Sequence, residues 1–176
     1  MRSFFFLTFL LFAFHALPPE LCQNAPAANR TPLRVGIVGL VHGHVQGFLD
    51  QSLHNPEIEI VGIAEPDQSL STRYAKQYNF DRALLFANLD EMLDRTHPQA
   101  VLVYTNTYDH RRVVETCARH GVHVMMEKPL AVSLTDALAI KKAADAARIQ
   151  VLVNYEDNLV PQQSRRLRSC QGKRAG

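Results

Sequence analysis

The chain has 176 residues, of which 47% are hydrophobic and 20% are charged, and a formal net charge of +2. This is the composition of an ordinary globular protein with enough length for one core, and it excludes a disordered or collagen-like chain. Residues 33–160 carry 12 basic and 16 acidic groups, whereas residues 161–176 carry five basic groups and none acidic. The basic character therefore belongs to the end of the chain, and we expect no nucleic-acid partner.

The first 27 residues have the pattern of a signal peptide. Arg2 precedes an apolar stretch from Phe4 to Phe14, and Ala25-Pro26-Ala27 supplies the small residues of a cleavage site. A single-pass membrane anchor is the alternative, but the stretch is shorter than the roughly 20 apolar residues that span a bilayer. We therefore expect an exported protein, periplasmic or secreted.

Strand and helix patterns alternate from residue 33 onward. Apolar, β-branched runs predict strands, and apolar residues at helical spacing between these runs predict amphipathic helices. The expected strands are 33–38, 58–64, 100–104, 122–126 and 150–153. The expected helices lie at about 45–53, after the N-caps Asp67 and Asn88, before Gly121, and from Ser133 to about Ala147.

This alternation indicates an α/β protein with a doubly wound parallel sheet. Near-continuous apolar strands need helices on both faces of the sheet, because a face that met water would show alternating polar residues. Ligands bind such sheets at the carboxyl ends of the strands, near the point where the strand order reverses. Functional residues should therefore cluster just after residues 38, 64, 104 and 126.

The turn after the first expected strand has part of a dinucleotide-binding pattern. Gly39 fits the first glycine, which lets the chain turn sharply into a helix whose N–H groups bind a pyrophosphate. Val41 and His44 stand where the second and third glycines belong, with His42 between them, so the motif match is poor. A purely structural turn stays the alternative for this segment.

Glu65 stands at the end of the second expected strand. A carboxylate at this position can accept hydrogen bonds from the adenosine ribose and repel a 2′-phosphate. The sequence thus favours NAD over NADP as the cofactor. The alternative is that Glu65 is a helix cap, a role for which Asp67 is also available.

The sequence predicts no metal site. Imidazole is a common metal ligand, but residues two apart at a helix start, such as His42 and His44, do not face each other, and no carboxylate or cysteine is near them in sequence. The cysteines lack the spacing of a zinc site or a disulfide framework. Cys117 falls on the apolar stripe of a helix, which favours a core position over a nucleophile.

Two further segments show a resemblance to a known family. One follows the expected strand 100–104 and contains Thr105, Asn106 and His110, and the other is Glu127-Lys128-Pro129 at the end of the next strand. With these segments the chain from about residue 34 to residue 155 resembles the glucose-fructose oxidoreductase, inositol 2-dehydrogenase and MocA family. The resemblance implies an NAD(P)-binding Rossmann domain at residues 33–155, and Glu-Lys-Pro is its most specific element.

The resemblance also implies roles for these residues. Lys128 would be catalytic, at the nicotinamide ribose and the substrate hydroxyl, where an ammonium stabilises developing alkoxide charge. Glu127 would hold the turn and contact the cofactor ribose, while Thr105, Asn106 and His110 would contact the nicotinamide half. Asn106 stands at the second position of this turn, where the family usually has the proline of Thr-Pro-Asn. We expect this difference, like Val41 in the glycine pattern, to affect cofactor affinity.

Residues 156–176 do not resemble the substrate domain that follows in this family. They lack strand alternation and a helical apolar face, and they are too few for a domain, so we expect a disordered, truncated start of it. A basic docking tail is the alternative.

The expected function is that of an NAD-binding module of an oxidoreductase that moves a hydride between NAD and a sugar or polyol hydroxyl. In this truncated form we expect it to be inactive alone and able to form homo-oligomers through the face that normally meets the second domain. A secreted, non-catalytic interaction module that retains the fold is the alternative.

Overall fold

The computed structural model describes residues 31–155, and both the expected signal peptide and the basic tail lie outside these residues. The described part forms a six-stranded sheet in the order β3-β2-β1-β4-β5-β6, with every pair parallel. The strands are β1 (Leu33–Val38), β2 (Ile58–Ala64), β3 (Leu85–Phe86), β4 (Ala100–Val103), β5 (His123–Glu127) and β6 (Val151–Asn154). The expected α/β fold class is confirmed.

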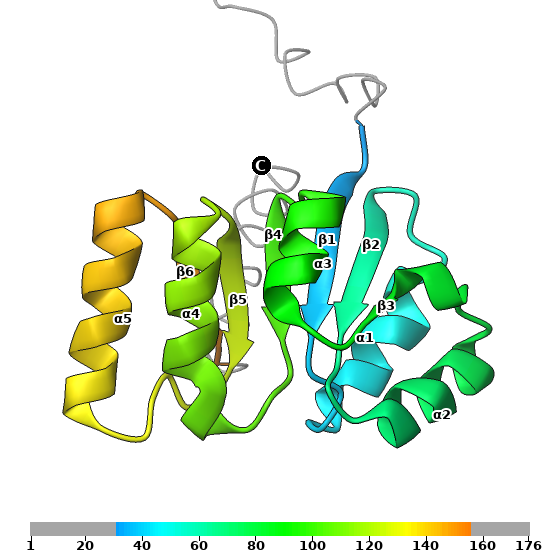
Figure 1. Ribbon diagram of the computed structural model, residues 1–176, viewed down its shortest axis with the longest axis horizontal. Helices are drawn as coiled ribbons and strands as arrows, with labels where there is room; N and C mark the ends of the chain where they lie inside the picture. Colours follow the sequence, from blue (N-terminus) through cyan, green and yellow to red (C-terminus); the bar gives the residue numbers. More distant parts are fainter. Residues whose placement is uncertain (1–30, 156–176) are drawn as a thin grey trace, which may run out of the picture. The chain divides into compact units, whose positions relative to one another are not determined.

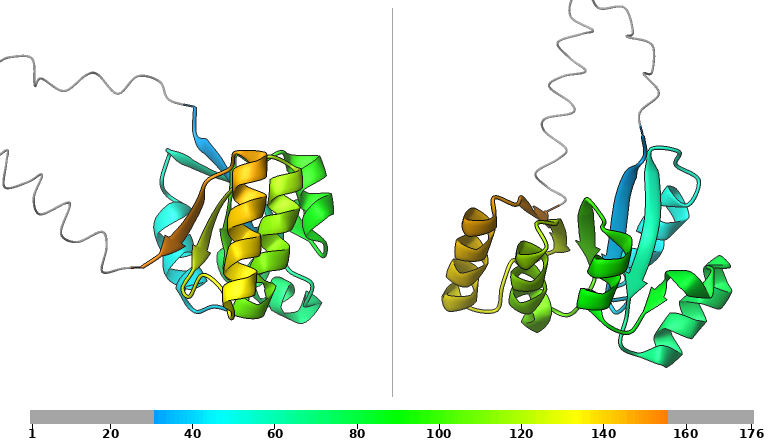
Figure 2. Two further views of the ribbon diagram at one scale, coloured as in Figure 1. Left: turned by 90° about the vertical axis from the view of Figure 1, so that its left-hand side faces the viewer. Right: turned by 45° about the horizontal axis from the view of Figure 1, so that its top comes forward.

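Helices cover both faces of this sheet (Figures 1 and 2). One face carries α1 (His44–Ser52) and α2 (Gln68–Tyr78), and the other carries α3 (Leu89–Thr96), α4 (His110–Arg119) and α5 (Leu134–Ala147). Two short 3₁₀ turns, η2 (Arg82–Leu84) and η3 (Thr107–Asp109), precede β3 and α4. Among the described helices we find none with the length and apolar character to cross a bilayer.

The local signals of the sequence account for the helix starts. Asp67 accepts hydrogen bonds from the N–H groups of Ser69 and Leu70, and the Asn88 side chain accepts one from the N–H of Glu91. Ser133 caps α5 in the same way. These N-caps are confirmed, whereas β3 was missed, because its two residues are too few to show a periodic pattern.

The sheet separates two apolar clusters. Toward α3, α4 and α5 the cluster includes Met92, Val114 and Ile140, and toward α1 and α2 it includes Ile37 and Leu49. Cys117 lies in the first cluster with no exposed surface, and burial raises the pKa of its thiol to about 12. Its predicted core position is confirmed.

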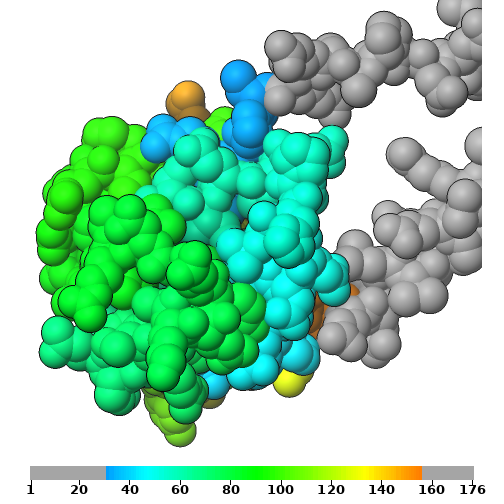
Figure 3. Space-filling view, turned by 90° about the vertical axis from the view of Figure 1, so that its right-hand side faces the viewer, coloured from blue at the N-terminus to red at the C-terminus, as the bar shows by residue number. Residues whose placement is uncertain are grey.

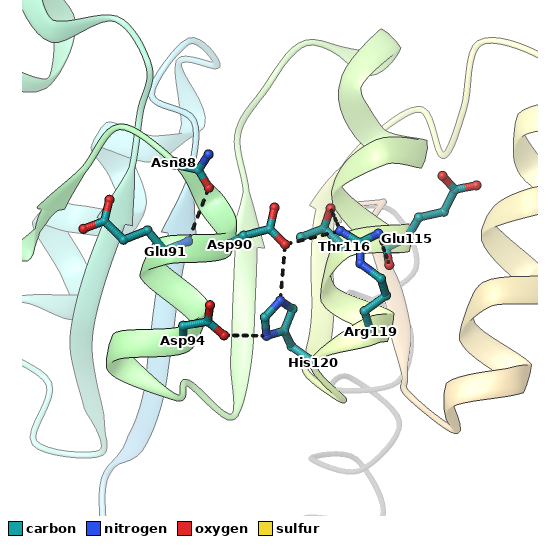
Figure 4. A network of polar contacts seen from close by, with 8 residues as sticks. All are labelled: Asn88, Asp90, Glu91, Asp94, Glu115, Thr116, Arg119 and His120. Atoms are coloured by element: carbon teal, nitrogen blue, oxygen red, sulfur yellow. Dashed lines mark hydrogen bonds and ion pairs between the residues drawn. The ribbon is translucent and has the colours of Figure 1, made fainter.

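On the surface, a polar network joins α3 to the end of α4 (Figure 4). The His120 ring lies 3.3 Å from an Asp90 carboxylate oxygen and 3.5 Å from one of Asp94, and Arg119 donates to Asp90 at 3.2 Å. The hydrogen bond from His120, together with Arg119, holds the pKa of Asp90 below its usual value. Exposed ion pairs add little stability, so we expect this network to contribute little to the free energy of unfolding.

The strand order reverses between β1 and β4, and the turns after these two strands touch. Gly39 has a φ of +79°, and a Cβ at this residue would lie 2.6 Å from Thr105 Cγ2 and 2.9 Å from the Thr105 backbone nitrogen. This position therefore requires glycine, both for its left-handed backbone and for the absence of a side chain.

We predict that Gly39→Ala lowers the free energy of unfolding by about 1–3 kcal/mol, because the new Cβ meets backbone in a left-handed residue. The matched control is Gly47→Ala in α1, where a Cβ would meet nothing within 4 Å. This control should stabilise the protein by about 0.5–1 kcal/mol through helix propensity. Urea unfolding measures both, and a Gly39→Ala protein as stable as wild type would refute the close-contact argument.

Candidate functional site at the carboxyl edge of the sheet

The segments that follow β1, β2, β4 and β5 meet at one edge of the sheet, as the sequence predicted. The Gly39 N–H donates to the Ala64 carbonyl at 2.8 Å, and the His42 N–H donates to the Tyr104 carbonyl at 3.0 Å. The β1–α1 turn is thus held between the ends of its two neighbouring strands.

These bonds decide which N–H groups of the turn stay available. Leu40 and His42 donate to acceptors within the fold, whereas nothing within residues 31–155 accepts from the N–H of Val41 or Gly43. The Val41 side chain is 65% exposed, and a Cβ at Gly43 would have open space around it. The free N–H groups at the start of α1 can therefore receive an anion such as a pyrophosphate.

Glu65 is nearly fully buried and ties two turns together. Its Oε2 accepts from the Leu40 N–H at 2.8 Å, and its Oε1 accepts from the Asp67 N–H at 2.8 Å. The cap of α2 is Asp67, so the helix-cap alternative for Glu65 is not what the structure shows. Each carboxylate oxygen keeps a second lone pair that can accept a ligand hydroxyl.

An open cavity of about 820 Å³ lies beside Glu65, between α2 and the segment through η2 and β3. Figure 3 shows this side of the molecule, where α1, α2 and the segment that leads to α3 come together in cyan to green. Its lining includes Glu65, Phe80, Phe86, Lys76 and Arg82. The volume suits a nucleoside, and the two phenylalanines give it apolar walls.

At the other end of this edge, Glu127 is 2% exposed and joins three segments. Its Oε1 accepts from Asn154 Nδ2 at 3.0 Å and lies 3.1 Å from His44 Nδ1. Burial alone would raise the pKa of Glu127, but the hydrogen bonds from Asn154 and His44 outweigh it and hold the pKa below its usual value. The sequence analysis did not single out Asn154. The signal that could have found it is a polar residue at the end of the last apolar strand.

Lys128 follows Glu127 and is exposed, so its ammonium is accessible to a ligand at this edge. The Lys128–Pro129 peptide bond is cis. Thr105 packs against Gly39, and Asn106 is exposed with its side chain donating to Asp109 at 2.7 Å. Both residues follow β4 at the carboxyl edge of the sheet, and their contact with the nicotinamide half stays a prediction.

His110 is buried, and its predicted contact with the nicotinamide half of the cofactor stays a prediction. The ring is 1% exposed and its Nδ1 lies 3.3 Å from the Leu130 carbonyl, so His110 supports the turn after Lys128 from below. Burial lowers the pKa of His110, against the opposing effect of the Leu130 and Pro129 carbonyls and the charges of Asp109 and Glu127. Sequence alone gave no sign of this burial.

The expectation that His42 and His44 do not face each other is wrong, whereas it holds that no carboxylate or cysteine is near them in sequence. The rings of His42 and His44 do meet, edge to face, with centroids 4.6 Å apart, because His42 lies in the turn before α1 rather than on the helix. A carboxylate, Glu127, comes from far along the chain to join them. The three residues form the one group of possible metal ligands found within residues 31–155.

Comparison with known proteins decides the family. Residues 33–155 match the model of the glucose-fructose oxidoreductase, inositol 2-dehydrogenase and MocA proteins, described as an oxidoreductase family with an NAD-binding Rossmann fold. The chain belongs to this family. Its described part is the family's NAD(P)-binding Rossmann domain.

Relatives in the family are similar over this domain. Glycosyl hydrolase family 109 protein 2 of Akkermansia muciniphila is 29% identical over 148 residues, covering 75% of this chain and 30% of the relative. Glucose-6-phosphate 3-dehydrogenase of Bacillus subtilis is 23% identical over 122 residues, covering 69% and 32%. The chain spans 30% to 40% of the length of these and two other curated relatives.

Among solved structures, the WlbA dehydrogenase from Chromobacterium violaceum, in complex with NADH and UDP-GlcNAcA, has a TM-score of 0.63 at 24% identity. The match covers 74% of this chain and 37% of that one. Aldose-aldose oxidoreductase from Caulobacter crescentus has a TM-score of 0.62 at 24% identity, covering 70% and 38%. Both likenesses establish the fold.

We predict that His110→Gln flattens the dependence of stability on pH between about pH 7 and pH 5. The pKa of folded His110 lies below the unfolded value of about 6.5, so the unfolded chain binds the proton first as pH falls. The stabilisation is complete above about pH 6.5 and is lost below it, toward the folded pKa. Urea unfolding across this range tests the slope.

The matched control is His54→Gln, which makes the same substitution at an exposed histidine. The carboxylates with lowered pKa, such as Asp90 and Asp136, lose their stabilising effect at more acidic pH, near and below about 4, and so act outside this window. Identical slopes in wild type and His110→Gln would contradict the burial argument.

Proposed function

We propose that this protein binds NAD in preference to NADP and serves the transfer of a hydride between NAD and a hydroxyl-bearing carbon of a sugar or polyol. The observation that carries the proposal is the placement of Glu65 and Lys128 along one edge of the sheet, with the free N–H groups of the β1–α1 turn between them. Family membership supplies the reaction class.

The residues at this edge fit a dinucleotide. Glu65 and the cavity beside α2 would hold the adenosine, with the carboxylate accepting from the ribose hydroxyls. The N–H groups of Val41 and Gly43, at the positive end of α1, would hold the pyrophosphate. Toward β4 and β5, Thr105 and Asn106 would border the nicotinamide half of the cofactor. When bound, the nicotinamide ring would supply the hydride acceptor.

Lys128 would act on the substrate. An ammonium near the reacting hydroxyl stabilises the charge that develops on oxygen as its proton leaves, and it orients that oxygen. Glu127 stays ionised beneath it and positions the end of β5 through Asn154. The sugar class is supported by relatives named as acting on sugars, among them glucose-6-phosphate 3-dehydrogenase.

We predict that NAD binds at least about fivefold more tightly than NADP, equivalent to about 1 kcal/mol of repulsion between Glu65 and a 2′-phosphate. Glu65→Gln keeps the side-chain shape and should narrow the difference. Asp67→Asn is the matched control, because it removes a neighbouring exposed carboxylate while keeping a good N-cap for α2. Titration calorimetry gives the affinities, and circular dichroism checks folding.

Lys76 and Arg82 also line the cavity, and their positive charges could instead favour NADP. Tighter binding of NADP that is lost in Arg82→Ala or Lys76→Ala would show that these cations read a 2′-phosphate. An unchanged ratio in Glu65→Gln would likewise count against the role of Glu65.

In any polypeptide that contains residues 31–155 and oxidises a sugar or polyol, we predict that Lys128→Ala lowers kcat by about 10²–10⁴-fold. Lys142→Ala, an exposed lysine on α5, should leave kcat unchanged. The rate of NADH formation measures both. A loss confined to KM would mean that Lys128 contributes binding alone and would contradict its role in proton removal.

A further inference from the structure

Two imidazoles and one carboxylate converge at the junction of the β1–α1 turn and the end of β5. The possible ligand atoms of His42, His44 and Glu127 all lie within 4.8 Å of one another. His44 Nδ1 and Glu127 Oε1 are 3.1 Å apart, close to the roughly 3.3–3.5 Å between two ligands of a tetrahedral zinc ion with bonds of about 2.0–2.2 Å.

An independent observation concerns the buried carboxylate of Glu127. Oε1 is occupied by Asn154 and His44, whereas Oε2 is buried and has no hydrogen-bond partner within the described part of the chain. A buried polar atom without a partner costs free energy, and an ion is one of the groups that can satisfy it.

We propose that His42, His44 and Glu127 form a binding site for one divalent transition-metal ion of the zinc type, with an open coordination position. The donor set of two imidazoles and one carboxylate suits such ions better than Mg²⁺ or Ca²⁺, which prefer oxygen. Three protein ligands leave a fourth position for water or a ligand oxygen, the arrangement of catalytic rather than structural zinc sites.

The site needs two local adjustments, because His44 Nδ1 must give up the proton that it donates to Glu127 Oε1 before it can bind an ion, and His42 must turn. His42 Nδ1 accepts a hydrogen bond of 3.3 Å from the His44 N–H, which is long and lies in exposed surroundings. The His42 side chain can therefore turn toward the other two ligands at little cost. Glu127 is already fixed by Asn154, so the most buried ligand is preorganised, as in sites with an orienting outer shell.

This inference goes beyond the proposed function and does not rest on it, because the ion would bind to side chains without any nucleotide. It would place a positive charge beside the free N–H groups of Val41 and Gly43. Binding of an ion in the absence of NAD separates failure of this proposal from failure of the cofactor assignment.

The test is a titration of the untagged, chelator-treated protein with Co²⁺ as a spectroscopic probe, followed by competition with Zn²⁺. We expect one Co²⁺ per chain, visible absorption of nitrogen and oxygen coordination, and displacement by Zn²⁺. His42→Ala, His44→Ala and Glu127→Gln should each weaken binding by at least about tenfold. His54→Ala, which removes an exposed histidine elsewhere, should bind as wild type does.

Three outcomes would overturn the proposal. They are no binding of either ion, wild-type affinity in the His42 and His44 variants, and a sulfur-to-cobalt charge-transfer band, which would place the ion on a cysteine. Glu127→Gln carries a risk of misfolding, so the two histidine variants, at more accessible positions of the turn, decide the result. Circular dichroism of each variant excludes loss of fold as the cause of weaker binding.

Discussion

The close contact between the turns after β1 and β4 is the constraint on which this site depends. The Tyr104 N–H donates to the Val38 carbonyl and the Tyr104 carbonyl accepts from His42, so both turns are bonded across the point where the strand order reverses. That approach requires a glycine at residue 39. Because Leu40 and His42 are used in the same set of bonds, the N–H groups of Val41 and Gly43 are left for a ligand.

Two buried carboxylates end the strands on either side of this contact, and they differ in how their charge is stabilised. Both oxygens of Glu65 accept a backbone N–H, so its charge is well compensated and it acts as a tie between turns. Glu127 has its donors on one oxygen and a bare second oxygen. The chemically unsatisfied end of the edge is therefore the β5 end, where Lys128 is also exposed.

The sequence predicted the fold well because its signals are local. Long apolar runs defined β1 and β2 to the residue, and the caps Asp67, Asn88 and Ser133 started their helices where expected. The sequence was less informative where the answer depends on packing. Nothing local reveals that His110 is buried, or that register places Asn154 opposite Glu127 and brings the latter to His44.

The β1–α1 turn departs from the glycine pattern but keeps the access to the backbone that this pattern provides. The second glycine serves to let an anion approach the backbone. Here Val41 stands in its place with its side chain largely in solvent, and the residue with open space around its Cα is Gly43, the N-cap of α1. The open approach to the helix start is thus retained two residues later. His42 and His44 flank it, so this turn presents two imidazoles where the usual pattern presents bare backbone.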